Sequence, residues 1–385
     1  MTLNPEICWI DTPEALDAAC EAVADASVIA LDTEFFRERT FHPVPALIQF
    51  CAGGPAYLVD PTAVACTAAF RRLLGGASEA ARPPAPLKLL HASSEDLEVF
   101  VRWSGVAIAP LVDTQIAQSL LGEVPSMGYQ KLVEHWLGET LPKEETRSNW
   151  LERPLSEKQL TYAALDVVYL LDVWARQRDA LERLGRLGWL EEDCEQLSAQ
   201  AARSDSADGR WYLRQRQLWR LSARQVEAYR RLTLWREGEI RRRDLPRGWL
   251  VSDKTLYAIA ERMPESRHAL AQVEGVNPPL IKREGDRLLA LVQQAREADE
   301  SALPRPPMSP MEPAFKRRMK AMKAVVNADA EQLGVAPEVL MNRRDLEALA
   351  AASLRGEPLP LPVGWRGERL SKALSQALSE VAEQQ

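Results

Sequence analysis

The sequence predicts an α/β domain with a mixed β-sheet, followed by two all-α domains. Over the first 200 residues, short runs rich in branched apolar residues alternate with longer stretches of helical periodicity. After residue 200 the helical periodicity continues almost without strand-like alternation. Small polar residues at 201–210 and five prolines at 301–313 interrupt it. We therefore expect domains at 1–205, 210–292 and 305–380.

Three consecutive strands are expected near the N-terminus. Residues 27–35 are rich in branched apolar side chains, and two further apolar runs follow at 46–52 and 56–60. The turn signal Gly-Gly-Pro at 53–55 lies between the last two runs. This spacing predicts a β-hairpin.

The rest of the α/β region is expected to contain one more strand and four helices, one of them the run TQIAQSLL at 114–121. A serine at the start of one helix, followed by early acids, is typical of a helix N-terminus, and Pro154 and Ser156 mark another start in the same way. The other expected segments are a helix at 62–75, a strand at 87–91, a helix at 93–103 and one long amphipathic helix at 155–184.

The composition is that of an ordinary globular protein. Of the 385 residues, 46% are hydrophobic and 27% are charged, which argues against disordered, collagenous and fibrous chains. No run approaches the ~18 apolar residues of a membrane span, and the N-terminus lacks a secretory pattern. The five cysteines are scattered and form no C-x-x-C pair. We expect reduced thiols in a cytoplasmic protein.

The charge is distributed unevenly along the chain. The total of −7 taken alone argues against a nucleic-acid partner. Residues 1–209, however, carry 17 basic and 32 acidic side chains, whereas residues 210–290 carry 18 basic and 10 acidic ones. Residues 291–385 carry 13 of each. An acidic region is therefore joined to a basic one, and the total does not exclude nucleic acid.

Four acidic residues stand out by their placement. Asp32 and Glu34 are two apart in a predicted strand, so their side chains share one face. Asp96 lies early in a predicted helix, and Asp166 interrupts an apolar run one helical turn after Tyr162. Solvated loop positions and favourable interaction with a helix N-terminus are ordinary alternatives for the first three. A carboxylate on an apolar face, however, requires a partner or a metal ion.

Together, the four carboxylates point to hard divalent cations. Mg²⁺ and Mn²⁺ prefer oxygen ligands, and two such ions about 4 Å apart stabilise both the attacking and the leaving oxygen of a phosphodiester. Since a tyrosine with a pKa near ~10 is a poor base at neutral pH, Tyr162 is expected to orient the attacking water.

Three separated strings resemble the exonuclease domain of the ribonuclease D family, which belongs to the DEDD exonucleases with a tyrosine in the third motif. The strings are LDTEFFRERTFHP (31–43), LLHASSEDLEVF (89–100) and RPLSEKQLTYAALDVVYLLDVW (153–174). The resemblance covers about residues 5–200 and implies an RNase H-like fold. It also implies that Asp32, Glu34, Asp96 and Asp166 are catalytic metal ligands and that Tyr162 is catalytic.

Two phenylalanines follow the first motif. Strand alternation places Phe36 on the face of Asp32 and Glu34, although regularity ends near this point. We expect one phenylalanine to pack inward and the other, Phe35, to bind substrate by stacking on a terminal base.

The helical half resembles two HRDC domains in succession. Residues 229–276 carry a tryptophan–arginine helix and the connector RRRDLPRGWLVSD, and residues 315–370 resemble a second, divergent copy. In the first, Arg241, Arg242 and Arg243 are candidate phosphate contacts, although a basic run is also typical of a solvated helix face. A basic face at 316–323 has the same two interpretations.

These observations predict a monomeric 3′–5′ exoribonuclease that uses two divalent ions, Mg²⁺ or Mn²⁺. By resemblance, its substrates are tRNA precursors and other structured RNA 3′ ends, and its products are nucleoside 5′-monophosphates. A DNA exonuclease of the same superfamily and an RNA-binding scaffold with a vestigial site are the alternatives.

Overall fold

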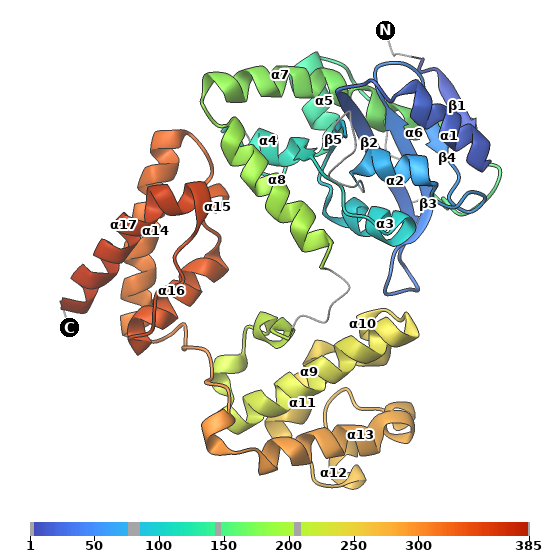
Figure 1. Cartoon of the computed structure of the whole chain (residues 1–385). Coiled ribbons are helices and arrows are strands. Elements are labelled where there is room, and N and C mark those ends of the chain that lie inside the picture. The colour runs from blue at the N-terminus through green and yellow to red at the C-terminus, as the bar shows by residue number, and fades with distance from the viewer. Residues whose placement is uncertain (1–3, 76–84, 123, 143–147, 204–208, 384–385) are drawn as a thin grey trace.

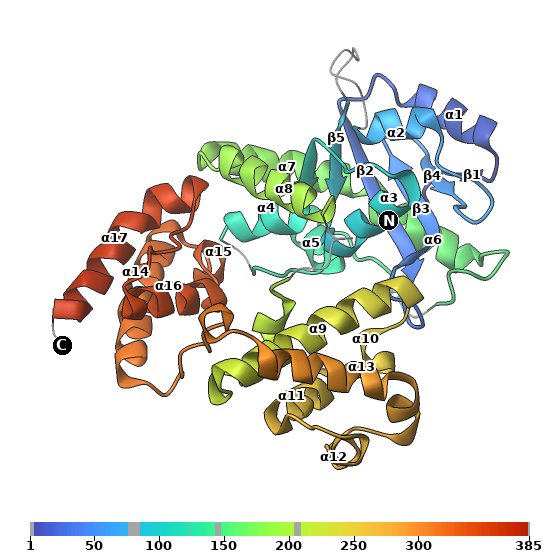
Figure 2. The ribbon, with the colours of Figure 1, turned by 60° about the horizontal axis from the view of Figure 1, so that its bottom comes forward.

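The computed structural model describes residues 4–75, 85–122, 124–142, 148–203 and 209–383. An α/β domain (residues 4–203) is followed by a middle module (211–297) and a C-terminal module (313–383), both helical. In Figures 1 and 2 the middle module lies below the α/β domain, and the C-terminal module lies to the left of that domain. The predicted succession of an α/β region and a helical region is confirmed. No helix in the described part of the chain has the length and apolar character needed to cross a membrane.

The α/β domain is built on a six-stranded mixed sheet with the order β1-β4-β3-β2-β5-β6. β2 pairs antiparallel with β3 and parallel with β5, and β3 and β4 form the predicted antiparallel hairpin. The outer pairs, β1 with β4 and β5 with β6, are parallel. The strands are β1 (Ile7–Ile10), β2 (Val28–Phe36), β3 (Val44–Cys51), β4 (Ala56–Val59), β5 (Leu87–Leu90) and β6 (Leu111–Asp113).

The two edge strands were not expected from the sequence. β1 has four residues and β6 has three, which is too short to show alternation. Both pair in parallel with a neighbour far along the chain, so their formation depends on tertiary contacts.

Eight helices of the described chain belong to the α/β domain. They are α1 (Pro13–Ala22), α2 (Ala68–Leu74), α3 (Ser94–Ser104), α4 (Thr114–Leu120), α5 (Tyr129–Leu137), α6 (Glu157–Val168), α7 (Leu170–Arg183) and α8 (Leu187–Ala201). The prediction of one helix over 155–184 is wrong, because the helix ends at Val168 and a second begins at Leu170. The break allows α6 to pack on β2, β3 and β4 while α7 packs on α4 and α5. The start at Ser156 is confirmed by its capping box.

Two other helix predictions need adjustment. The helix expected at 62–75 begins only after Thr67, whose side chain caps the Phe70 amide. Ser93 precedes α3 but does not cap it, because its hydroxyl donates to Asp113 at 2.9 Å.

The middle module has a hydrophobic core of its own. It consists of the 3₁₀ turns η1 (Trp211–Arg214) and η2 (Leu218–Arg220) and the helices α9 (Ala223–Arg243), α10 (Arg247–Leu250), α11 (Asp253–Arg262), α12 (Arg267–Ala271) and α13 (Pro278–Glu297). Its contact with the α/β domain is polar: Asp244 accepts hydrogen bonds from the Phe41 and His42 amides at 3.0 and 2.9 Å. The Arg241 guanidinium lies 4.6 Å from the Phe41 ring centre.

The C-terminal module shares a continuous hydrophobic core with the α/β domain. After η3 (Glu300–Ala302), its helices are α14 (Pro313–Leu333), α15 (Pro337–Leu340), α16 (Arg343–Arg355) and α17 (Gly364–Glu383). The Trp365 ring stacks on that of Trp189 in α8 with centres 4.4 Å apart, and Arg366 forms an ion pair with Asp193. The two helical modules are therefore attached to the α/β domain in different ways.

Candidate active site

Three carboxylates converge where β2 passes beneath α6. Asp32 and Glu34 project from the same face of β2, and Asp166 projects from α6. Each offers an oxygen within 4.8 Å of the other two. The alternation of β2 brings the first pair together, and the packing of α6 on the sheet adds the third. This is a donor set of the kind that binds a hard divalent cation.

Asp96 lies beside this group rather than within it. It is buried in the first turn of α3, and its carboxylate accepts a hydrogen bond of 2.5 Å from the Thr33 hydroxyl. Because Thr33 lies between Asp32 and Glu34 in β2, this bond ties Asp96 to the strand that carries the other acids. Thr33 was not identified from the sequence, since only the folded structure brings α3 against β2.

Three carboxyl groups of the site, those of Asp32, Glu34 and Asp96, have raised pKa values. Burial, together with the charges of Asp96, Asp166 and Glu34, raises the pKa of Asp32 well above its usual value. Burial and the charges of Asp166 and Asp96 raise the pKa of Glu34 to about 9. Burial also raises the pKa of Asp96 to about 7, against the opposing effect of the Thr33 hydrogen bond.

The cause of these shifts is a lack of compensating positive charge. Within the described residues, no lysine or arginine forms an ion pair with Asp32, Glu34 or Asp96. Ionised carboxylates this close repel one another, and burial weakens their hydration. Divalent cations would relieve both costs, so the residues fit the metal ions that the sequence predicts.

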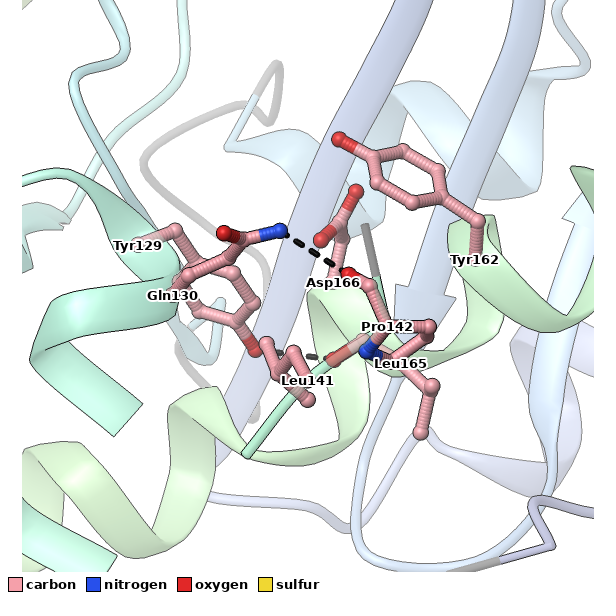
Figure 3. A pocket seen from close by; sticks show the side chains of 7 residues that line it. All are labelled: Tyr129, Gln130, Leu141, Pro142, Tyr162, Leu165 and Asp166. Atoms are coloured by element: carbon pink, nitrogen blue, oxygen red, sulfur yellow. Dashed lines mark hydrogen bonds between the residues drawn. The ribbon is translucent and has the colours of Figure 1, made fainter. Parts of the chain in front are cut away.

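Two tyrosines flank Asp166. Tyr162 lies one helical turn before it on α6, and Figure 3 shows the two side chains together at a small pocket that Tyr129 also lines. The Tyr129 hydroxyl donates to the Leu165 carbonyl at 2.8 Å, so it helps to hold the helical turn that carries Asp166. Burial and the neighbouring carboxylates raise the pKa of both hydroxyls, so both stay protonated at neutral pH. Tyr129 was missed because nothing in its local sequence indicates this contact.

The two phenylalanines after Glu34 follow a β-bulge. The register of β2 against β3 shifts between Glu34 and Phe35, so simple alternation does not extend to Phe36. Phe35 is half-buried and packs against the main core of the α/β domain. Stacking of Phe35 on a substrate base stays a prediction.

The three arginines predicted to bind substrate lie at the end of α9, and carboxylates engage all of them. Arg241 pairs with Glu237 at 2.9 Å and is only 16% exposed. Arg242 pairs with Glu239, and Arg243 pairs with both Glu239 and Glu284. The solvated-face interpretation does not describe Arg241, which contributes to the contact with Phe41. Phosphate contact by these arginines stays a prediction.

Comparison with known proteins agrees with this geometry. A family model described as 3′–5′ exonuclease matches residues 7–182, and a model of the HRDC domain matches residues 225–292. Ribonuclease D from Pseudomonas paraeruginosa is 39% identical over 378 residues, covering 97% of this chain and 98% of the relative. Ribonuclease D from Escherichia coli K12 is 36% identical, covering 96% and 98%.

A solved structure is similar over almost the entire chain. It is that of Escherichia coli RNase D, described as an exoribonuclease involved in structured RNA processing. It superposes with a TM-score of 0.86 at 34% sequence identity and covers 98% of this chain and 99% of that one. The arrangement of the α/β domain and the helical modules is therefore common to both.

Proposed function

This chain belongs to the ribonuclease D family and is a 3′–5′ exoribonuclease, and we propose that Asp32, Glu34, Asp96 and Asp166 together hold two divalent ions for its hydrolytic reaction. The proposal is supported above all by one observation. Three of these carboxylates lie within 4.8 Å of one another, and Asp96 is bonded to the strand that carries two of them. Exonucleases of this fold use divalent metal ions. That this chain holds two of them, and that they are Mg²⁺ or Mn²⁺, is part of the proposal.

In the proposed reaction, water attacks the phosphorus of the last phosphodiester. The bond from phosphorus to the 3′ oxygen of the preceding nucleotide breaks, so that a nucleoside 5′-monophosphate leaves and the shortened RNA keeps a free 3′ hydroxyl. The bound ions supply stabilisation of the charge that develops on the phosphate and favour deprotonation of the attacking water.

The chain's own residues position these groups. Asp32 and Glu34 fix the site to β2, and Asp166 closes it from α6. The raised pKa keeps the Tyr162 hydroxyl protonated, so it acts by hydrogen bonding and orients the attacking water rather than removing its proton. Tyr129 keeps the Asp166 turn in place through the Leu165 carbonyl.

The proposed substrates are tRNA precursors and other structured RNA 3′ ends, bound by a monomer. The printed description of the Escherichia coli relative, which names structured RNA, supports this choice. That the C-terminal module is a second, divergent HRDC domain is also proposed.

The experiment that tests the function is digestion of matched RNA and DNA strands with Mg²⁺ or Mn²⁺. We expect faster removal of ribonucleotides from the 3′ end, with 5′-monophosphates as products. Faster DNA cleavage would favour a DNA exonuclease, and an absence of cleavage with every divalent ion would favour a scaffold.

A further inference from the structure

Three exposed lysines line a groove of the C-terminal module. The groove, of about 490 Å³, lies between α14 and α16, and Lys316, Lys320 and Lys323 line it from one face of α14. These positions are three or four residues apart, so their side chains project in the same direction. They span about 10 Å along the helix axis, which is long enough to meet more than one phosphate of a strand.

The three lysines are free of acidic partners. All are exposed, and no ion pair with an acidic side chain of the described chain involves them. The one glutamate that lines the groove, Glu347, is already paired with Arg343 at 2.7 Å. In a chain whose total charge is −7, this groove is therefore a local excess of positive charge.

Arg318 belongs to the same basic run but has a structural role. Arg318 is buried, 3% exposed, and donates to the Ser353 hydroxyl and the Ala314 carbonyl. It therefore holds α14 against α16.

Part of the groove lining is apolar. Phe315 is buried in the module's core, and Met319 and Pro310 line the groove beside the lysines. Positive side chains along an apolar surface suit a single nucleic-acid strand, because the lysines meet the phosphates while bases and riboses cover the apolar atoms. Lysine is a flexible point charge, so such contact needs no fixed sequence.

We propose that the α14–α16 groove is a binding site for the RNA backbone, separate from the carboxylate site of the α/β domain. The proposal rests on the proposed function insofar as RNA is the polyanion that the reaction brings to this chain. An acidic peptide meets the same charges, but the reaction of this chain acts on RNA and not on a peptide. The groove would hold a part of the substrate upstream of the 3′ end that is hydrolysed.

The test neutralises the three lysines together in the full chain, as Lys316→Gln, Lys320→Gln and Lys323→Gln. Binding of a single-stranded RNA of about 20 nucleotides is measured by fluorescence anisotropy against salt, with EDTA present to prevent cleavage. We expect affinity to fall about tenfold and the magnitude of the slope of log K against log salt to fall by about 2. Cleavage of a trinucleotide with Mg²⁺ should be unchanged, because none of the three lysines belongs to the carboxylate site.

Two matched variants complete the experiment. Arg178→Gln, Arg267→Gln and Lys254→Gln remove the same charge from exposed side chains that already have acidic partners. This variant should keep most of the affinity and the salt slope. Replacing the three groove lysines with arginine keeps the charge and should keep binding, which also shows that the module tolerates substitution there.

The outcomes separate the groove from the proposed function. If the wild type cleaves the trinucleotide but the glutamine variant binds long RNA with unchanged affinity and slope, the groove is not an RNA site, whether or not an acidic peptide occupies it. If the Arg178/Arg267/Lys254 variant loses as much RNA affinity as the groove variant, the loss is due to the change in net charge, and the proposal is also overturned. If the wild type cleaves no RNA, the proposed function fails, whereas the anisotropy result still decides the groove.

Discussion

Two groups of buried carboxylates in this molecule have opposite electrostatic surroundings. In α9, Glu237 is completely buried but accepts hydrogen bonds from Arg241 and Arg247. Burial alone would raise its pKa, but these arginines outweigh burial and hold the pKa below its usual value. In β2, burial raises the pKa of Asp32 and Glu34, and no arginine opposes it. The same side-chain chemistry stabilises the fold in one place and is left uncompensated, ready for cations, in the other.

The comparison also shows that the arginines at the end of α9 already have acidic partners, which their sequence alone does not indicate. The arginines at the end of α9 pair with Glu237, Glu239 and Glu284, and Arg241 lies over the ring of Phe41 in the α/β domain. Among the residues that the structure describes, no acidic side chain forms an ion pair with the groove lysines of α14. Basic residues in a sequence therefore identify a nucleic-acid surface only after their intramolecular partners are known.

The largest expected effect is the loss of activity when one carboxylate of the active site is replaced. Asp32→Asn should lower kcat on RNA by about 10³-fold or more, because the metal ions contribute several kcal/mol to stabilising the transition state. In metal-free buffer, the same variant should unfold at a higher temperature than the wild type, because a neutral amide avoids the cost of burying an ionisable carboxyl group among other carboxylates. Single-turnover kinetics and thermal unfolding with EDTA measure the two effects. Retained activity would show that Asp32 is not a ligand.

Removing the charge of Glu237, which is paired with arginines, should lower stability and leave activity unchanged. Glu237→Gln removes the acidic partner of Arg241 and Arg247 and one of the two acidic partners of buried Arg236, and we expect a loss of about 2–4 kcal/mol in unfolding free energy. Chemical denaturation measures it. Since Glu237 lies outside the carboxylate site, kcat on a trinucleotide should not change in the folded variant. Glu239→Gln, at a more exposed position of the same helix, is the control and should cost less.

Tyr162 tests whether the hydroxyl beside Asp166 acts in the reaction or only in packing. Tyr162→Phe keeps the ring and removes the group that orients water, so we expect kcat to fall about 10- to 100-fold with little change in RNA affinity. Tyr129→Phe is the matched variant, since its hydroxyl bonds to the Leu165 carbonyl instead. Equal losses of affinity and turnover on Tyr162→Phe would contradict the orienting role.

The last expected effect is a pH dependence of stability. Glu34 has a pKa of about 9 in the folded, metal-free protein, above its value in an unfolded chain. The native state therefore holds a proton that the unfolded state releases between these values, and stability falls as pH rises through this window. Glu34→Gln should flatten this fall. Denaturation with EDTA at several pH values in the window measures the difference; parallel curves for the two proteins would disprove the shift.

Much of the carboxylate site could be predicted because it depends on local periodicity. Strand alternation places Asp32 and Glu34 on one face, and one helical turn relates Tyr162 to Asp166. Contacts between distant segments could not be predicted in this way. The hydrogen bond from Thr33 to Asp96 joins β2 to α3, and that from Tyr129 to the Leu165 carbonyl joins α5 to α6. Neither contact can be inferred from the sequence of either element.

The helical elements show the same limit. Periodicity runs through Tyr169 without interruption, but the chain breaks there because α6 and α7 pack on different parts of the domain. Similarly, the sequence contains the arginines and glutamates of α9 but does not state which of them pair. The shared core between the C-terminal module and α8, through Trp365 and Trp189, was also not foreseen.

The central claim is that the uncompensated carboxylates of β2 and α6 bind the divalent ions of the reaction. Calorimetric titration of Mn²⁺ into the wild type and into Asp32→Asn, with RNA cleavage measured on the same samples, tests it most directly. We expect Mn²⁺ to bind the wild type and activate cleavage, and both binding and cleavage to be strongly reduced in the variant. Equal Mn²⁺ binding by the two proteins, or cleavage by the wild type in EDTA, would contradict the claim.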